Sequence, residues 1–164
     1  MKSIERGYLV FALALFLPAA GSAQVKQERA RPEPATHSVV TAGAVAFTPL
    51  EIPGFPTGTK IAVLHGDPNA ASGDYTIRLS FPDGYQFPAH WHPGAEHLTV
   101  LEGSLMIGMG NKADIGKEES YAPGTFIYFP GRMSHFGGAK GATVIQLHGV
   151  APFKIVLSKP ATTK

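Results

Sequence analysis

Residues 84–103 read GYQFPAHWHPGAEHLTVLEG and place two histidines, a turn and a glutamate close together in the sequence. His90 and His92 are two residues apart, and side chains two apart on a β-strand point to the same face. The Pro-Gly pair that follows predicts a turn, after which Glu96 can return to that face. Two imidazoles and one carboxylate would then converge, and this mixture of donors suits a divalent transition metal such as Fe, Mn, Ni, Zn or Cu.

A second stretch supplies one more candidate ligand. Residues 124–135 read GTFIYFPGRMSH, which predicts a strand, a Pro-Gly turn and then His135. Buried imidazole and carboxylate groups without partners cost free energy, and one metal ion would satisfy them together. We therefore expect one metal ion held by four side chains: His90, His92, Glu96 and His135. The alternative is a metal-free barrel in which these polar groups line a ligand pocket.

Both stretches resemble the motifs of the cupin superfamily. The first motif, G-x5-H-x-H-x3,4-E-x6-G, is matched by Gly84, His90, His92, Glu96 and Gly103. The second motif, G-x5-P-x-G-x2-H-x3-N, is matched by Gly124, Pro130 and His135. Two positions depart from it, because the turn glycine stands one residue early, at Gly131, and Ala139 replaces the final asparagine. These departures leave the shape of the second turn open.

The resemblance extends over about residues 60–157 and implies a fold. It implies an all-β chain that forms a single cupin jelly-roll β-barrel (a double-stranded β-helix) with the metal inside its mouth. The wider arrangement is similar to small exported bacterial cupins.

The residues themselves also predict one all-β domain, over residues 44–158. The chain has 164 residues, and its 19 glycines and 14 prolines separate short β-rich runs. The run 75–81 (YTIRLSF) alternates as a half-buried strand should. The predicted strands are 44–48, 60–65, 75–81, 86–92, 97–101, 104–109, 125–129, 142–148 and 153–157. Residues 112–120 are expected to form a helical turn.

The N-terminus has the pattern of a cleaved signal peptide. Lys2 and Arg6 precede the apolar run 9–20, and small residues follow at 21–23. We expect residues 1–23 to be the signal peptide, 24–43 a flexible polar lead and 159–164 a tail. The mature protein is then periplasmic or secreted, and makes no membrane contact after cleavage.

Composition excludes several classes of function. The chain has no cysteine, which excludes disulfides, Cys-ligated zinc, iron–sulfur clusters and thiol catalysis. Its net charge is +2 without a block of like charges, so we expect no nucleic-acid partner. The expected partner is a small-molecule ligand or substrate, and a homodimer is left open.

Four further side chains are candidates for a substrate pocket. Gln86 shares the strand parity of His90, and Tyr128 belongs to an aromatic strand of which either face could form the pocket wall. Gln146 and His148 share a strand face, so they could line the pocket or cap an edge. His97 follows Glu96 directly and is expected to face away from the metal.

The predicted ligand set leaves two main functions open. Four protein ligands leave one or two positions on a five- or six-coordinate metal. We therefore expect a metal-dependent enzyme of the dioxygenase, decarboxylase or isomerase type, acting on a small organic substrate. The alternative is a non-catalytic periplasmic module that binds metal or a small ligand. The sequence identifies no catalytic acid or base.

Overall fold

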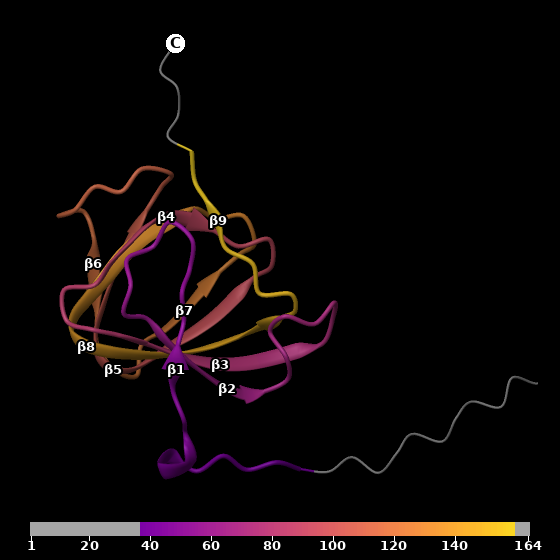
Figure 1. Ribbon diagram of the computed structural model, residues 1–164. Coiled ribbons are helices and arrows are strands. Elements are labelled where there is room, and N and C mark those ends of the chain that lie inside the picture. The colour runs from indigo at the N-terminus through magenta and orange to yellow at the C-terminus, as the bar shows by residue number, and fades with distance from the viewer. Residues whose placement is uncertain (1–36, 160–164) are drawn as a thin grey trace, which may run out of the picture. The chain divides into compact units, whose positions relative to one another are not determined.

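The computed structural model describes residues 37–159, so the predicted signal peptide and most of the lead and tail lie outside the described residues (Figure 1). Apart from one 3-10 turn, η1 (Ala42–Ala44), the described regular elements are strands. They are β1 (Thr48–Pro49), β2 (Lys60–His65), β3 (Asp74–Phe81), β4 (Gln86–Trp91), β5 (Glu96–Met109), β6 (Glu119–Tyr121), β7 (Phe126–Phe129), β8 (His135–Val150) and β9 (Val156–Leu157). Within residues 37–159, no helical segment has the length and apolarity that a membrane crossing requires.

The long strand β8 organises the sheet. Its second half pairs with β3 and its first half with β4, while β5 pairs along its other edge and also holds β6 and β7. The path through the sheet is β1-β2-β3-β8-β4-β9, and the ribbons curl around one interior (Figure 1). The prediction of an all-β jelly roll is therefore confirmed.

Two predicted strands, 97–101 and 104–109, form the single bent strand β5. The bend lies at Gly103, which has φ 73°, and the register with β8 shifts between Val100 and Glu102 and again between Glu102 and Ser104. A Cβ at this position would lie 2.3 Å from the carbonyl oxygen of Ala142. The motif glycine is thus required both for its backbone conformation and for the close approach of β8.

Two other expectations about the strands are corrected. Residues 112–120 do not form a helical turn, and Glu119–Tyr121 is instead the short strand β6 against β5. Strand β8 begins at His135 rather than at residue 142. The glycines between residues 137 and 141 predict a turn locally, but pairing with β4 and β5 keeps this segment extended.

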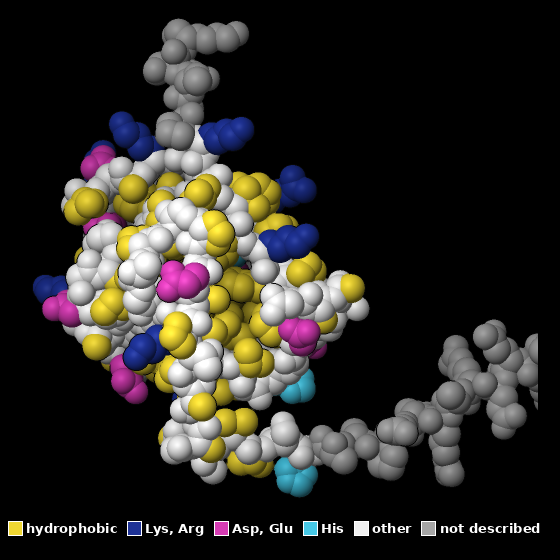
Figure 2. Space-filling view, in the orientation of Figure 1, with side chains coloured by type: hydrophobic (Ala, Val, Ile, Leu, Met, Phe, Trp, Pro, Cys, Tyr) yellow, Lys and Arg dark blue, Asp and Glu magenta, His cyan; other side chains and the backbone are white. Residues whose placement is uncertain are grey.

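The core follows the alternation of the strands. In β3, Tyr75, Ile77, Leu79 and Phe81 are buried, while the residues between them face outward. Burying a side chain of this kind contributes about 1.5–3 kcal/mol. Figure 2 shows a hollow on one face of the molecule, with hydrophobic side chains on its floor.

Candidate metal centre

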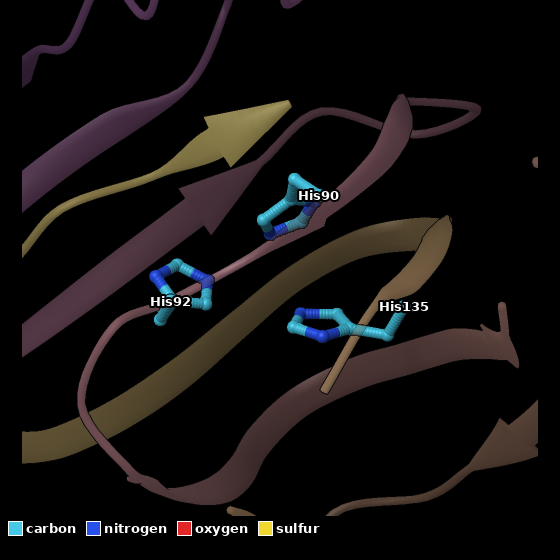
Figure 3. A group of neighbouring side chains, drawn as sticks. All are labelled: His90, His92 and His135. Carbon is cyan, nitrogen blue, oxygen red and sulfur yellow. The ribbon is translucent and has the colours of Figure 1, made fainter. Parts of the chain in front are cut away.

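Three buried histidines meet inside the barrel (Figure 3). His90 is near the end of β4 and pairs directly with His135, the first residue of β8. His92 follows β4, and the candidate ligand atoms of the three side chains all lie within 4.8 Å of one another. The fold therefore brings together the three histidines that the sequence motifs predicted as ligands.

Backbone carbonyls fix the tautomer of all three rings. The Nδ1 atom of His90 donates to the Pro88 carbonyl oxygen at 2.8 Å, that of His92 to the Lys154 oxygen at 2.9 Å, and that of His135 to the Met133 oxygen at 3.2 Å. A carbonyl oxygen can only accept, so each Nδ1 carries the hydrogen. Each neutral ring therefore keeps a lone pair on Nε2, the atom available to a metal.

Burial keeps these imidazoles neutral. Desolvation, together with the neighbouring His135, lowers the pKa of His90 to about 4. Desolvation and the other two histidines lower the pKa of His92 to about 3, and burial also lowers the pKa of His135. Metal ligation requires neutral imidazole, so the cluster is in its binding form at neutral pH.

Glu96 lies next to this cluster at the start of β5. It is buried, and its Oε2 atom is 3.3 Å from Nε2 of His92. Burial raises the pKa of Glu96 to about 8, so this contact joins a neutral imidazole to a protonated carboxyl rather than two charges. Both atoms are acceptors once the carboxyl loses its proton, and a cation would then have to lie between them.

The donor set fits a divalent transition metal. Among residues 37–159, Nε2 of His90 and Nε2 of His135 have no hydrogen-bond partner, and Nε2 of His92 contacts only the Glu96 carboxyl. Three imidazole nitrogens that face one cavity are the ligands that Fe, Ni, Cu and Zn accept. The three-histidine cluster could therefore bind a metal ion.

A bulge in β4 explains where Gln86 lies. Phe87 pairs with Gly137 and His90 with His135, so three residues of β4 span two residues of β8. This extra residue brings both Phe87 and His90 to the cavity and leaves Gln86 exposed. The prediction that Gln86 shares the inward face of His90 is therefore wrong.

The other three pocket candidates also lie outside the cavity. Tyr128 is 53% exposed beside His97, while its neighbours Ile127 and Phe129 face the core. Gln146 and His148 are on the outer face of β8, whereas Ile145 and Leu147 line the cavity. There the Arg78 guanidinium donates to Gln146 at 3.0 Å, and His148 contacts Thr76 at 2.9 Å. These three side chains therefore lie outside the inner cavity, because the opposite strand phase faces inward.

Arg132, in the Pro-Gly turn before His135, contacts the segment that carries the first motif. This residue has φ 67°, a left-handed conformation that is uncommon for residues other than glycine. Its backbone N–H donates to the His92 carbonyl oxygen at 2.7 Å, and its guanidinium lies 5.9 Å from the Trp91 ring centroid. Because the turn glycine stands one residue early, at Gly131, Arg132 occupies the left-handed position. Its hydrogen bond to His92 still joins the turn before His135 to the segment of His90 and His92.

Aromatic rings surround the histidine cluster. Phe129 stacks on His135 with a centroid distance of 4.4 Å, and Phe153 stacks on His92 at 5.3 Å. Phe55 contacts His90 edge-on at 5.1 Å. Apart from the three histidines and Glu96, the described residues that line this inner cavity of about 50 Å³ are apolar. Phe55 lies in a loop, where no strand pattern could have indicated its direction.

Comparisons with solved structures agree with this architecture. The chain is similar to the polyketide cyclase RemF of Streptomyces resistomycificus, with a TM-score of 0.61, 20% identity, and coverage of 77% of this chain and 89% of that one. It is similar to a putative acetylacetone dioxygenase of Methylibium petroleiphilum, with a TM-score of 0.60, 18% identity, and coverage of 81% and 91%. It is also similar to a cupin-2 domain protein of Rhodospirillum rubrum, with a TM-score of 0.55, 18% identity, and coverage of 80% of this chain and 86% of that one. At these identities the similarity concerns the fold.

Sequence comparisons identify the family. Germin-like protein 1 of Brassica napus is 32% identical over 85 residues, which are 49% of this chain. The aligned part spans 41% of that relative's length. The family model described as the ChrR cupin-like domain matches residues 36–153, which include both histidine motifs and the strands that carry them. The chain is therefore a cupin and belongs to the ChrR cupin-like domain family.

Proposed function

We propose that this protein is an exported, metal-dependent enzyme that acts on a small organic molecule, in a reaction of the dioxygenase, decarboxylase or isomerase type. One observation carries the proposal: three neutral, buried imidazoles lie beside a buried carboxyl in an otherwise apolar cavity. We assign the three histidines as ligands and Glu96 as the fourth. The 3.3 Å contact between Glu96 and His92 supports this assignment, because both atoms can share one cation.

The chain's own residues would hold and shield the reacting centre. A divalent transition metal bound there would supply Lewis acidity or the activation of O₂. The three backbone carbonyls orient the imidazole rings through Nδ1. Phe129 and Phe153 stack on two of these rings and exclude water. In the absence of metal, Glu96 holds its carboxyl proton until a cation replaces it.

A second function is favoured by what the inner cavity contains. Among the described residues that line it, the three histidines and Glu96 are the titratable groups. A general acid or base would have to come from this ligand set. That restriction favours the alternative of a non-catalytic periplasmic module, which would hold a metal or a small ligand without turnover. The RemF and dioxygenase neighbours support an enzyme only by fold, and one fold hosts many chemistries.

Elemental analysis and oxygen consumption separate these two functions. The protein is purified after export from its native host, its metals are quantified, and O₂ uptake is screened with small uncharged organic compounds. For a dioxygenase we expect iron and O₂ uptake that His90→Ala abolishes and His97→Ala retains. Zinc or nickel without O₂ uptake would exclude a dioxygenase and favour an isomerase or a binding module. A protein that retains no metal would contradict the enzyme and the metal-binding module, and would leave only a module that holds a small ligand.

A further inference from the structure

A second, larger hollow lies directly outside the inner cavity. This outer groove has a volume of about 590 Å³ and is open to solvent. It lies between the loop before β2, the loop after β2 and the segment before β9, where Figure 2 shows hydrophobic side chains on the floor of a hollow. The outer groove and the inner cavity share three apolar lining residues: Ile52, Phe153 and Ile155. These residues form the boundary between the two spaces.

The lining of the outer groove selects against anions. Its floor and walls are mostly apolar, and include Leu50, Ile61 and the half-exposed Val63. The two charged residues that line it, Glu51 and Asp67, are both acidic and exposed. None of the described lining residues is Lys or Arg. An anionic ligand would therefore lose hydration without gaining a cationic partner and would meet two like charges.

The inner cavity limits how far a ligand can enter. Its volume of about 50 Å³ is smaller than the roughly 150 Å³ of an engineered cavity that holds benzene. The apolar body of an organic ligand must therefore remain in the outer groove. Only a small polar end can pass the boundary toward the histidines, next to Phe153, whose ring is stacked on His92.

We propose that the outer groove binds the body of a small, uncharged, apolar molecule whose polar end reaches past Ile52, Phe153 and Ile155 to the histidine cluster. This inference rests on the proposed function, because it names the substrate class of the same site. Glu51 and Asp67 set the charge preference, and Val63 forms part of the wall without lining the inner cavity.

Matched probes test the charge preference directly. Methyl 2-naphthoate and 2-naphthoate share one aromatic body and differ in charge, and their binding is followed by naphthalene fluorescence. Binding is measured on the exported protein as purified and again after chelator treatment. We expect the ester to bind about tenfold more tightly than the carboxylate in both preparations, because the groove itself holds the aromatic body. Equal affinities, or tighter binding of the carboxylate, would overturn the inference.

Two surface variants place the probe in the outer groove. Val63→Lys should weaken ester binding by about tenfold, while Val63→Leu should retain it, since only the first introduces a charge. Glu51→Lys should raise the affinity for the carboxylate several-fold. Phe126→Lys adds the same charge at an exposed strand position that lines neither space and should change neither affinity. An unchanged affinity in Val63→Lys would overturn the inference. The metal content of each sample is recorded separately, so loss of the metal site is distinguishable from failure of the groove.

Discussion

At the scale of single residues, the site depends on where its protons are. Each histidine donates its Nδ1 hydrogen to a backbone carbonyl, which leaves Nε2 as an acceptor. Glu96 then meets the Nε2 of His92 as a protonated carboxyl, because burial raises its pKa to about 8. The metal-free site is therefore a neutral cluster that can exchange one proton for one cation.

The raised pKa of Glu96 predicts a pH-dependent stability of the metal-free protein. Between pH 4.5 and about 8, the folded protein retains the Glu96 proton while the unfolded chain has lost it. The stabilisation that this proton provides is therefore complete below pH 4.5 and is lost as pH rises to about 8. Glu96→Gln should not show this loss of stability, because the glutamine amide does not titrate. The free energy of unfolding of the variant, relative to wild type, should rise by at least about 1 kcal/mol between pH 5 and 8 in urea titrations.

The control for this measurement lies on the same strand. Glu102 is exposed on β5, so Glu102→Gln should follow the wild-type pH profile. The lowered pKa values of the histidines reduce stability below about pH 6.5 in the variants and in wild type alike, and this contribution cancels in the comparison. Parallel profiles for Glu96→Gln and wild type would show that Glu96 keeps an ordinary pKa.

The same proton predicts the pH dependence of metal affinity. If Glu96 is a ligand, binding below pH 8 must displace its proton, so the affinity should fall about tenfold for each pH unit between pH 7 and 5. Glu96→Gln should bind more weakly at pH 7 and show a much smaller slope. Titration calorimetry in buffers of different ionisation enthalpy measures both the affinity and the protons released. A wild-type slope retained in Glu96→Gln would exclude Glu96 as the fourth ligand.

At the scale of strands, two glycines of the first motif have different structural roles. Gly84 and Gly103 both have φ 73°, but a Cβ would meet nothing within 4 Å at Gly84 and backbone atoms of β8 at Gly103. The bend of β5 at Gly103 connects the part of the strand that carries Glu96 to the part that pairs with the start of β8.

This difference predicts unequal costs for the same substitution. Gly84→Ala should destabilise the protein by about 1 kcal/mol, because only the left-handed backbone is strained. Gly103→Ala should cost about 2–4 kcal/mol, because overpacking against Ala142 and Thr143 is added. Urea unfolding of both variants measures the two costs. Equal losses would contradict the close approach of β5 and β8 at this position.

Strand patterns in the sequence predicted the direction of some side chains correctly and of others wrongly. Strand alternation predicted that His90 and His92 share a face and that His97 points outward, and the resemblance to the second cupin motif added His135. Alternation failed for Gln86, because a bulge in β4 shifts the phase between Phe87 and His90. Alternation also could not predict which face of β7 points inward. Tyr128 lies outside because Phe129, on the other face, occupies the core. Long-range pairing also extended β8 through glycines that predict a turn locally.

At the scale of the whole molecule, one barrel combines a buried polar cluster with an apolar entrance. The inner cavity and the outer groove meet at three apolar residues, so a ligand that enters from the groove passes an apolar boundary before it reaches the histidines. The apolar lining lowers the local dielectric constant and strengthens electrostatic interactions within the cluster.

Export is the prediction that concerns the whole chain. The basic start, the apolar run 9–20 and the small residues 21–23 predict cleavage after Ala23. Intact-mass measurement on protein expressed in its native host should show loss of the first 23 residues, with Gln24 as the new N-terminus. Retention of Met1 in a cytoplasmic protein would contradict this expectation.

The central claim, that the histidine cluster is a metal site, is tested most directly by comparing metal affinity in two histidine variants. His92→Ala removes an imidazole whose Nε2 faces the cluster, whereas His97→Ala removes one from the opposite, exposed face of β5. Titration with Zn²⁺ and Fe²⁺ should give one site per chain in wild type, an unchanged affinity in His97→Ala and a loss of at least about 100-fold in His92→Ala. Equal affinities in the two variants would show that the metal is not held by this cluster.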